Sequence, residues 1–390
     1  RDVAPSRGLG DVYKRQEQFR LPLETEKDSY EASGKALGWK AENGKVVVSS
    51  SNVYFELDKA TGMVTSYKVN GTEFFDKAFG VQPNFWRAPN DNDYGNSNPK
   101  RLQIWKESSR DFKVSDTAVR EEGETVLMSV TYDLPAGNQY LITYRIYRDG
   151  VVNVNVKFTQ TDREAEKTEV LEDTNLATFT PGKKVKKKDV LEVPRIGVRF
   201  RIPHVMNRVE YFGRGPVENY VDRNAGSMVG RYKTSVEEMY VNYVRPQENG
   251  HRTDTRWVSF TNTAGRGLLV LAEKTIGFNA LRNTVEDFDS EESSHPYQWR
   301  NRSSKEVAGK NEAEAKNVLR RMTHVNDITP RDFVEVCIDM KQQGVAGYDS
   351  WGAKVQPGYT IPASRDYVWG FTLIPIKNVG DVNKSLRYTY

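Results

Sequence analysis

The feature that most constrains the fold of this chain is an alternation of apolar and polar side chains with a period of two. One pair of such runs covers residues 141–147 and 152–158, and Asp149-Gly150 stands between them. Successive side chains of a strand point to opposite faces of a sheet, and Asp-Gly is a favoured two-residue turn. These residues therefore predict a β-hairpin.

The same pattern recurs along much of the chain. Residues 53–57 and 63–69 flank a turn at Thr61-Gly62, and Asn70-Gly71 follows them. Shorter runs occur at 256–260, 268–272, 333–340 and 367–373. These strands do not alternate with helical segments, which disfavours a β/α barrel or a doubly wound sheet. The sequence predicts an all-β chain folded as a large antiparallel sandwich.

Charge and hydropathy argue against two classes of partner. The net charge is +4, and residues 1–16 contribute +2 of it, because they carry four basic and two acidic side chains. These residues are similar to translated sequencing adaptor, so we expect a non-native leader there. The remaining charge is too small to indicate a nucleic acid, and the basic run 183–188 lacks interleaved aromatic residues. No apolar run approaches the roughly 18 residues of a membrane span.

The cysteine and histidine patterns indicate neither a disulfide within the chain nor a metal site. Cys337 is the single cysteine, so no disulfide forms within the chain, and its alternating surroundings predict a small core residue rather than a nucleophile. The four histidines are scattered, and neither His-Glu-x-x-His nor Cys-x-x-Cys occurs. We expect no protein-built metal site. No signal peptide is visible, and the compartment stays open between cytoplasm and periplasm.

The segment Gly213–Arg223 concentrates special backbone and polar chemistry in a short stretch. It reads Gly-Arg-Gly-Pro-Val-Glu-Asn-Tyr-Val-Asp-Arg. Two glycines invite comparison with a dinucleotide-binding loop, but Glu218 occupies the position of the third glycine. Its carboxylate would repel a pyrophosphate, so we reject that interpretation.

Two further polar segments allow alternatives. In Tyr243–Arg252, Glu248 and His251 could act as an acid–base pair, but a loop whose polar groups tie strand ends together is favoured. In Asn84–Gly95, Asp91 and Asp93 could bind a cation or support a sharply turning loop. Support is favoured, because Asp side chains readily bond nearby backbone amides. The residues that follow, 96–100, are interpreted as a mobile segment.

A fourth segment, Gly347–Gly352, contains Trp351 outside any apolar alternation. Such a tryptophan is hard to explain as a core residue. Sugars present apolar C–H faces, and an aromatic plane suits them. A sugar platform and a packing role are both open on these residues alone.

Together the four segments resemble, in order and separation, motifs in the C-terminal region of family 2 β-galactosidases. The similar stretches are Arg87-Ala88-Pro89-x-Asp91-Asn92-Asp93-x-Gly95, Arg195-Ile196-Gly197, Gly213–Arg223, Tyr243–Gly250 and Asp349-Ser350-Trp351. The resemblance covers about residues 17–390 and extends to the small subunit of two-chain β-galactosidases. Residues 303–321 depart from it, because they appear longer than the family pattern.

The resemblance implies a domain organisation. Residues 17–43 would hold the last strand of an immunoglobulin-like domain and a linker. Residues 44–390 would form a supersandwich like that of galactose mutarotase. The two catalytic glutamates of such enzymes lie on a separate β/α barrel, in the same chain or in a large subunit. The resemblance therefore implies no catalytic residue here, and Asn311-Glu312 is given no catalytic role.

The resemblance also implies supporting roles for particular residues. Trp351 matches the tryptophan that stacks on the sugar, and Arg87, Asp91, Asp93 and Gly95 match an active-site loop and its support. Architectural roles are implied for Gly213, Gly215, Glu218, Asn219, Asp222, Arg223, Glu248 and Asn249. The family often forms oligomers and uses magnesium and sodium, whose ligands would lie mostly outside this chain, so no cofactor is expected here.

Two rival functions remain at this stage. The first is an aldose 1-epimerase that uses Glu248 and a histidine as base and acid. The second is a sugar-binding β-sandwich that acts by itself. The favoured function is the C-terminal part of a β-galactosidase, which completes the aglycone side of the pocket and does not hydrolyse galactosides alone.

Overall fold

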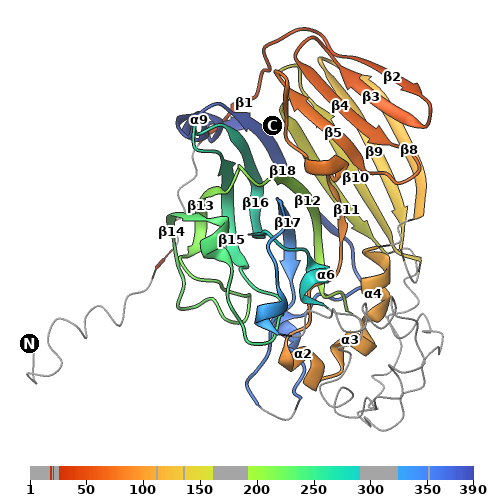
Figure 1. Ribbon diagram of the computed structural model, residues 1–390. Coiled ribbons are helices and arrows are strands. Elements are labelled where there is room, and N and C mark those ends of the chain that lie inside the picture. Colours follow the sequence, from red (N-terminus) through yellow and green to blue (C-terminus); the bar gives the residue numbers. More distant parts are fainter. Residues whose placement is uncertain are drawn as a thin grey trace, which may run out of the picture.

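The computed structural model describes residues 18–19, 21, 26–110, 113–134, 137–160, 192–289, 324–349 and 352–390. Within these residues the chain consists mainly of antiparallel β-strands with a few short helices (Figure 1). The expectation of an all-β, largely antiparallel fold is confirmed. No described helix is long and apolar enough to cross a membrane.

A twelve-stranded sheet forms the body of the molecule. Its continuous path runs, in order, through β14 (Met228–Ser235), β13 (Arg208–Gly215), β15 (Arg252–Thr261), β16 (Gly267–Leu281), β18 (Tyr367–Ile376), β11 (Val152–Thr159), β10 (Gln139–Ile146), β9 (Thr125–Asp133) and β8 (Lys113–Glu122). The sheet branches at β16, whose first half pairs with β18 and whose second half pairs with β17 (Phe333–Gln342). Strand β12 (Arg195–Pro203) then pairs with β17 and with β7 (Gln82–Asn84).

A five-stranded sheet lies beside β8–β11 (Figure 1). Its strands, in order, are β2 (Gly38–Glu42), β3 (Lys45–Ser49), β4 (Val53–Asp58), β5 (Val64–Val69) and β6 (Thr72–Glu73). The rings of Phe55 and Tyr144 lie 5.5 Å apart across the two sheets. The hydroxyl of Tyr67 donates to the carbonyl of Gly150 at 2.6 Å. Aromatic side chains thus join the two sheets in one core.

The predicted hairpins are present. Strands β10 and β11 pair across the turn at Asp149-Gly150, with Tyr144 opposite Val154, both fully buried. Strands β4 and β5 pair across Thr61-Gly62. The four shorter apolar runs fall within β15, β16, β17 and β18. Cys337 is buried in β17, as expected for a core residue, and burial raises the pKa of its thiol.

Short elements complete the part of the chain that the structure describes, and the following helices and turns are those of this part. The α-helices are α2 (Asp91–Gly95), α3 (Asn98–Arg101), α4 (Gln103–Ser108), α5 (Val236–Met239), α6 (Val285–Phe288) and α9 (Gly380–Ser385). Three 3-10 turns are η1 (Asp76–Ala78), η6 (Val325–Asp327) and η7 (Pro357–Tyr359), and β1 (Asp28–Ser29) pairs in parallel with β19 (Tyr388–Thr389). The runs 183–188 and 303–321, with Asn311-Glu312, lie outside the described residues.

Truncating the aromatic contact between the sheets should destabilise the fold. We expect Phe55→Ala to lower the free energy of unfolding by about 3–5 kcal/mol, because a fully buried ring is replaced by a cavity. Val368→Ala, at a position 69% exposed on β18, is the control and should change stability by less than about 0.5 kcal/mol. Urea unfolding of the three proteins measures both values. Equal stabilities would contradict the proposed role of this contact.

Candidate functional site

The four polar segments singled out in the sequence come together at one end of β12 and β17. The amide of Glu248 donates to the carbonyl of Ala88 at 3.1 Å, and the amide of Asn219 donates to the carbonyl of His251 at 2.9 Å. The carboxylate of Asp222 accepts hydrogen bonds from the residues just before Gly347. The segments are far apart in sequence, so only the tertiary fold makes them one cluster.

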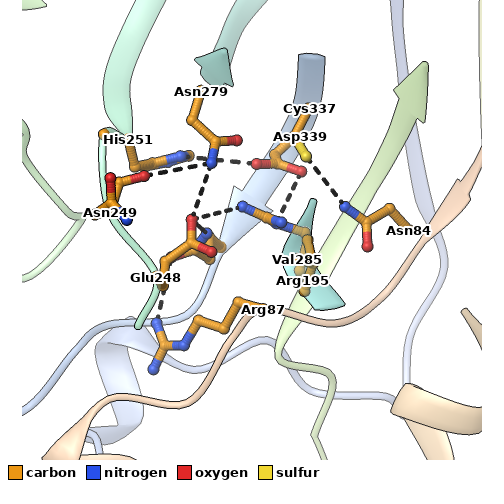
Figure 2. A network of polar contacts seen from close by, with 12 residues as sticks. Asn84, Arg87, Arg195, Glu248, Asn249, His251, Asn279, Val285, Cys337 and Asp339 are labelled. Carbon is orange, nitrogen blue, oxygen red and sulfur yellow. Dashed lines mark hydrogen bonds and ion pairs between the residues drawn. The ribbon is translucent and has the colours of Figure 1, made fainter. Parts of the chain in front are cut away.

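Arg195 lies at the centre of this cluster, at the start of β12 (Figure 2). Its side chain is fully buried, and its Nη2 donates to Oε1 of Glu248 at 2.9 Å. Its Nε lies 3.2 Å from Oδ1 of Asp339, and its Nη1 donates to the carbonyl of Trp86 at 3.2 Å. A buried guanidinium needs such partners, because an unpaired charge in the interior is very costly.

Strand register explains why these charges meet. In β12, residues 195, 197, 199 and 201 share one face. Residues 339, 337 and 335 of β17 lie opposite the last three, and Gln342 lies opposite Arg195 after a register shift between Ile196 and Gly197. On this face Arg201 donates to Glu335 at 3.1 Å, and Arg195 pairs with Asp339. The carboxylate of Asp339 needs the space that Gly197 leaves, since a methyl group there would lie 2.1 Å from Oδ1.

The ionisable groups of this face have shifted proton affinities. Burial raises the pKa of Asp339 to about 7; the positive charge of Arg195 opposes the shift, and the negative charge of Glu248 adds to it. Burial lowers the pKa of His251 well below its usual range, and the charges of Arg195, Arg252 and Arg87 act in the same direction. His251 is therefore a neutral imidazole near neutral pH, stacked on the ring of Tyr220.

Burial argues against the disfavoured alternative, in which Glu248 and His251 act as an acid–base pair. Glu248 is 5% exposed, and its Oε1 also accepts hydrogen bonds from Gln342 at 3.0 Å and Asn279 at 3.4 Å. His251 is 1% exposed. Neither side chain presents a free face to a sugar ring, which weighs against the epimerase alternative. The neighbouring Asn249 has a local role, because its side chain bonds the amide of Val241 and the carbonyl of Gln247.

The Arg87 segment surrounds a second buried ion pair. Nη2 of Arg87 lies 2.8 Å from Oδ1 of Asp93, and both side chains are 2% exposed. Asp93 also caps the start of α2 by accepting from the amide of Asn90 at 3.1 Å, and it accepts from the side chain of Asn98 at 2.8 Å. Asp93 thus supports the local backbone. Residues 96–100, interpreted as mobile, include the start of α3 in the structure.

Asp91 and Gly95 lie on the outer side of this segment. The side chain of Asp91 is 72% exposed and pairs with Arg245 at 3.2 Å, which links the Asn84–Gly95 segment to the Tyr243–Arg252 segment. Gly95 packs closely against Gly352, since a methyl group on Gly352 would lie 2.4 Å from the carbonyl oxygen of Gly95. Helix α2 and the fourth motif therefore touch through their backbones.

The Gly213–Arg223 segment is held by its own polar residues. Gly213 and Gly215 end β13, and the Gly215–Pro216 bond is cis. Glu218 accepts from the amide of Gly250 at 2.9 Å and from Arg223 at 3.3 Å. Asn219 is fully buried; its side chain donates to the carbonyls of Arg214 and Val217 and accepts from the amide of Thr253 at 3.0 Å.

Asp222 connects this motif to the fourth one. Its Oδ1 accepts from the amide of Val345 at 3.0 Å, and its Oδ2 accepts from the amide of Ala346 at 2.9 Å. Trp351, the predicted sugar platform, and Ser350 lie outside the described residues. The structure therefore describes the support on both sides of Trp351, up to Asp349 and from Gly352 onward.

Sequence reasoning missed several members of the cluster. Arg195 and Asn92 were noticed only as parts of motifs, and Asp339, Asn279 and Gln342 were not singled out. A signal was available for Asp339, because it shares the alternating face of Cys337, which was expected to be buried. A carboxylate on a buried face requires a cationic partner, and β12 supplies one.

The comparisons with known proteins agree on one family. Residues 49–373 match the family described as "Beta galactosidase small chain". A β-galactosidase of Priestia megaterium is 31% identical over 362 residues, which is 92% of this chain and 29% of that protein. A β-galactosidase of Streptococcus thermophilus is 27% identical over 331 residues, covering 84% of this chain and 27% of that protein. The chain thus spans less than a third of the length of these relatives.

Solved structures give a weaker likeness. A galactose 1-epimerase from Lactobacillus acidophilus NCFM matches with 6% identity and a TM-score of 0.40, covering 90% of this chain and 99% of that one. A putative aldose 1-epimerase from Escherichia coli K12 matches with 6% identity and a TM-score of 0.39, covering 85% and 98%. These values are too low to carry an argument about activity.

The raised pKa of Asp339 should appear in the pH dependence of stability. The folded state keeps a proton that the unfolded chain releases at its ordinary pKa of 3.8. The contribution of this group to the free energy of unfolding therefore falls as pH rises from about 4 to about 7, and then levels off. Asp339→Asn removes this slope, so its stability relative to the natural protein should rise over the same window by roughly 1–4 kcal/mol.

Urea unfolding between about pH 4 and 8 measures this difference. The lowered pKa of His251 gives the opposite slope below its ordinary value of 6.5. Asp116→Asn, at an exposed position of β8, is the matched control and should show no such window. A relative stability that falls with pH would mean that the ionised carboxylate is the stabilising form.

Proposed function

Because this chain belongs to the β-galactosidase small chain family, we propose that it is the C-terminal, non-catalytic part of a β-galactosidase. The whole enzyme hydrolyses terminal β-D-galactosides with retention, and this part completes the aglycone side of its pocket. The observation that carries the proposal is the convergence of two polar segments, Asn84–Gly95 and Gly213–Arg223, on the backbone that leads to Trp351. The buried ion pair of Arg87 and Asp93 supports the backbone that precedes Trp351 and does not activate a catalytic side chain.

The chemistry requires a second module. Retaining hydrolysis uses two carboxyl groups about 5–5.5 Å apart, one as nucleophile and one as acid and base. In this cluster the carboxylates of Glu248, Asp93 and Asp339 face buried arginines and have no open side toward a substrate. In this proposal a β/α barrel carries the two catalytic glutamates, either in the same chain or as a large subunit. The relatives' additional length is sufficient for such a module.

Trp351 has a binding role in this proposal. An indole plane packs against the apolar C–H face of a sugar, and the polar hydroxyls around the ring point elsewhere. Arg87 and Asp222 support the backbone that precedes it. The family's oligomerisation belongs to the whole enzyme. In this proposal so do its magnesium and sodium, because the resemblance places their ligands mostly outside this chain.

The 390-residue chain alone should not hydrolyse galactosides, because the acid and the nucleophile are supplied elsewhere. A nitrophenyl β-galactoside assay measures this, and addition of a separately expressed catalytic module should restore turnover. Polarimetry with anomerically pure galactose should show no mutarotation above the buffer rate, and calorimetry with lactose should show very weak binding. Hydrolysis by the chain alone would contradict the proposal that the catalytic groups lie on a separate module, whereas mutarotation would favour the epimerase alternative.

Loss of the indole should weaken substrate binding in the whole enzyme. We expect Trp351→Ala to raise KM about 3- to 10-fold, in line with the free energy of a single aromatic stacking contact. Trp39→Ala, at an exposed position of β2 in the five-stranded sheet, is the matched control and should leave KM unchanged. Steady-state kinetics on several galactosides provides the measurement. An unchanged KM for every galactoside in the Trp351 variant would remove the stacking role.

A further inference from the structure

The backbone of residues 343–345 is held by side chains from a remote part of the chain. Nη1 of Arg87 donates to the carbonyl of Gln343 at 2.8 Å, and Nη2 donates to the carbonyl of Gly344 at 2.9 Å. Nδ2 of Asn92 donates to the carbonyl of Val345 at 2.9 Å. Three successive carbonyl groups are thus bonded from the Arg87 side, and the residues that carry them are buried.

Asp222 holds the same backbone from the opposite direction. Its two oxygens accept from the successive amides of Val345 and Ala346, at 3.0 and 2.9 Å. Hydrogen bonds to an ionised carboxylate are stronger than those to a neutral acceptor. Arg87, Asn92 and Asp222 therefore form a clamp, and of these three Asp222 is the one that bonds the N–H groups of the turn.

The backbone that leaves the clamp is strained. Ala346 has φ of 55° and Gly347 has φ of 95°, so two successive residues lie in the left-handed region. A residue with a Cβ atom adopts that region only at a cost in free energy. The two amides that Asp222 bonds are at and immediately before this point. Asp222 offsets the strain, and it fixes the direction in which the chain continues toward Trp351.

We propose that Asp222 is a positioning residue: it fixes the clamped turn at Val345–Gly347, on which the proposed contact of Trp351 with sugar depends. The proposal rests on the proposed function of Trp351, and it extends that function to a residue that touches no substrate. The proposal also gives a role to Asp222 within the Gly213–Arg223 motif. The preceding residues Glu218 and Asn219 hold that motif by hydrogen bonds with the amides of Gly250 and Thr253. Asp222 is thereby presented to the turn from a rigid base.

The contact can be broken from either side. Asp222→Asn replaces an acceptor oxygen by an NH2 group, which faces an amide N–H and cannot accept from it. Gly344→Ala approaches from the turn, because its added methyl group would lie 2.4 Å from Oδ2 of Asp222. Gly358→Ala is the matched control, since a methyl group there meets no atom within 4 Å.

The first experiment measures hydrogen exchange of the peptide spanning residues 344–349 in the full chain. Gly344→Ala should accelerate exchange of the Val345 and Ala346 amides at least about tenfold, because these N–H groups lose their acceptor. Asp222→Asn should do the same for the amide that faces its new NH2 group, since the remaining oxygen can still accept from the other amide. Exchange in β10 and β11 should stay unchanged, which shows that the fold is intact. Gly358→Ala should behave like the natural protein. Unchanged exchange in both clamp variants would overturn the clamp.

The second experiment is a double-mutant cycle in the whole enzyme. Asp222→Asn alone should raise KM in the direction of Trp351→Ala, and it should add little once Trp351 is already alanine. A fully additive effect would overturn the link between Asp222 and Trp351. If Trp351→Ala changes no KM, the proposed function fails and the link fails with it, whereas the exchange experiment still decides the clamp by itself.

Discussion

The buried guanidinium of Arg195 is the contact on which the arrangement of the site depends. It joins β12 to β17 through Asp339, to the Tyr243–Arg252 segment through Glu248 and to the Asn84–Gly95 segment through the carbonyl of Trp86. Removing one partner of a buried ion pair typically costs about 3–5 kcal/mol, because the remaining charge stays unpaired. The buried charges are therefore paired in only one relative placement of these segments. That placement also sets the positions of the loops attached to them.

The two faces of β12 have different roles, since one packs in the apolar core and the other carries paired charges. Ile196, Val198 and Phe200 are fully buried in the apolar core, while Arg195, Arg199 and Arg201 on the other face meet carboxylates. Apolar packing provides most of the stability without specifying one exact pairing. The charged face is more selective, since a shifted register would leave arginine and carboxylate groups buried without partners. This combination suits a domain that must present distant loops in a fixed geometry.

The electrostatics of the cluster support a positioning role over a chemical one. His251 is kept neutral by burial and by nearby arginines, and Glu248 is already bonded by Arg195 and Gln342. A general acid or base needs an exposed face and a proton affinity matched to its task. What leaves the cluster toward solvent is backbone, at Ala346 and Gly347. The charged residues hold that backbone, and the proposed contact with sugar lies at the end of it.

The sequence by itself determined the strands and the polar motifs. Alternation around Asp149-Gly150 and Thr61-Gly62 fixed two hairpins, since side-chain period and turn chemistry are local properties. The family resemblance implied structural roles for Glu218, Asp222 and Asp93, but not which groups they bond. Only the tertiary structure paired Arg195 with Asp339, and Asp222 with the amides of Val345 and Ala346. Those partners are separated by more than a hundred residues, and no local preference encodes the strand order that brings them together.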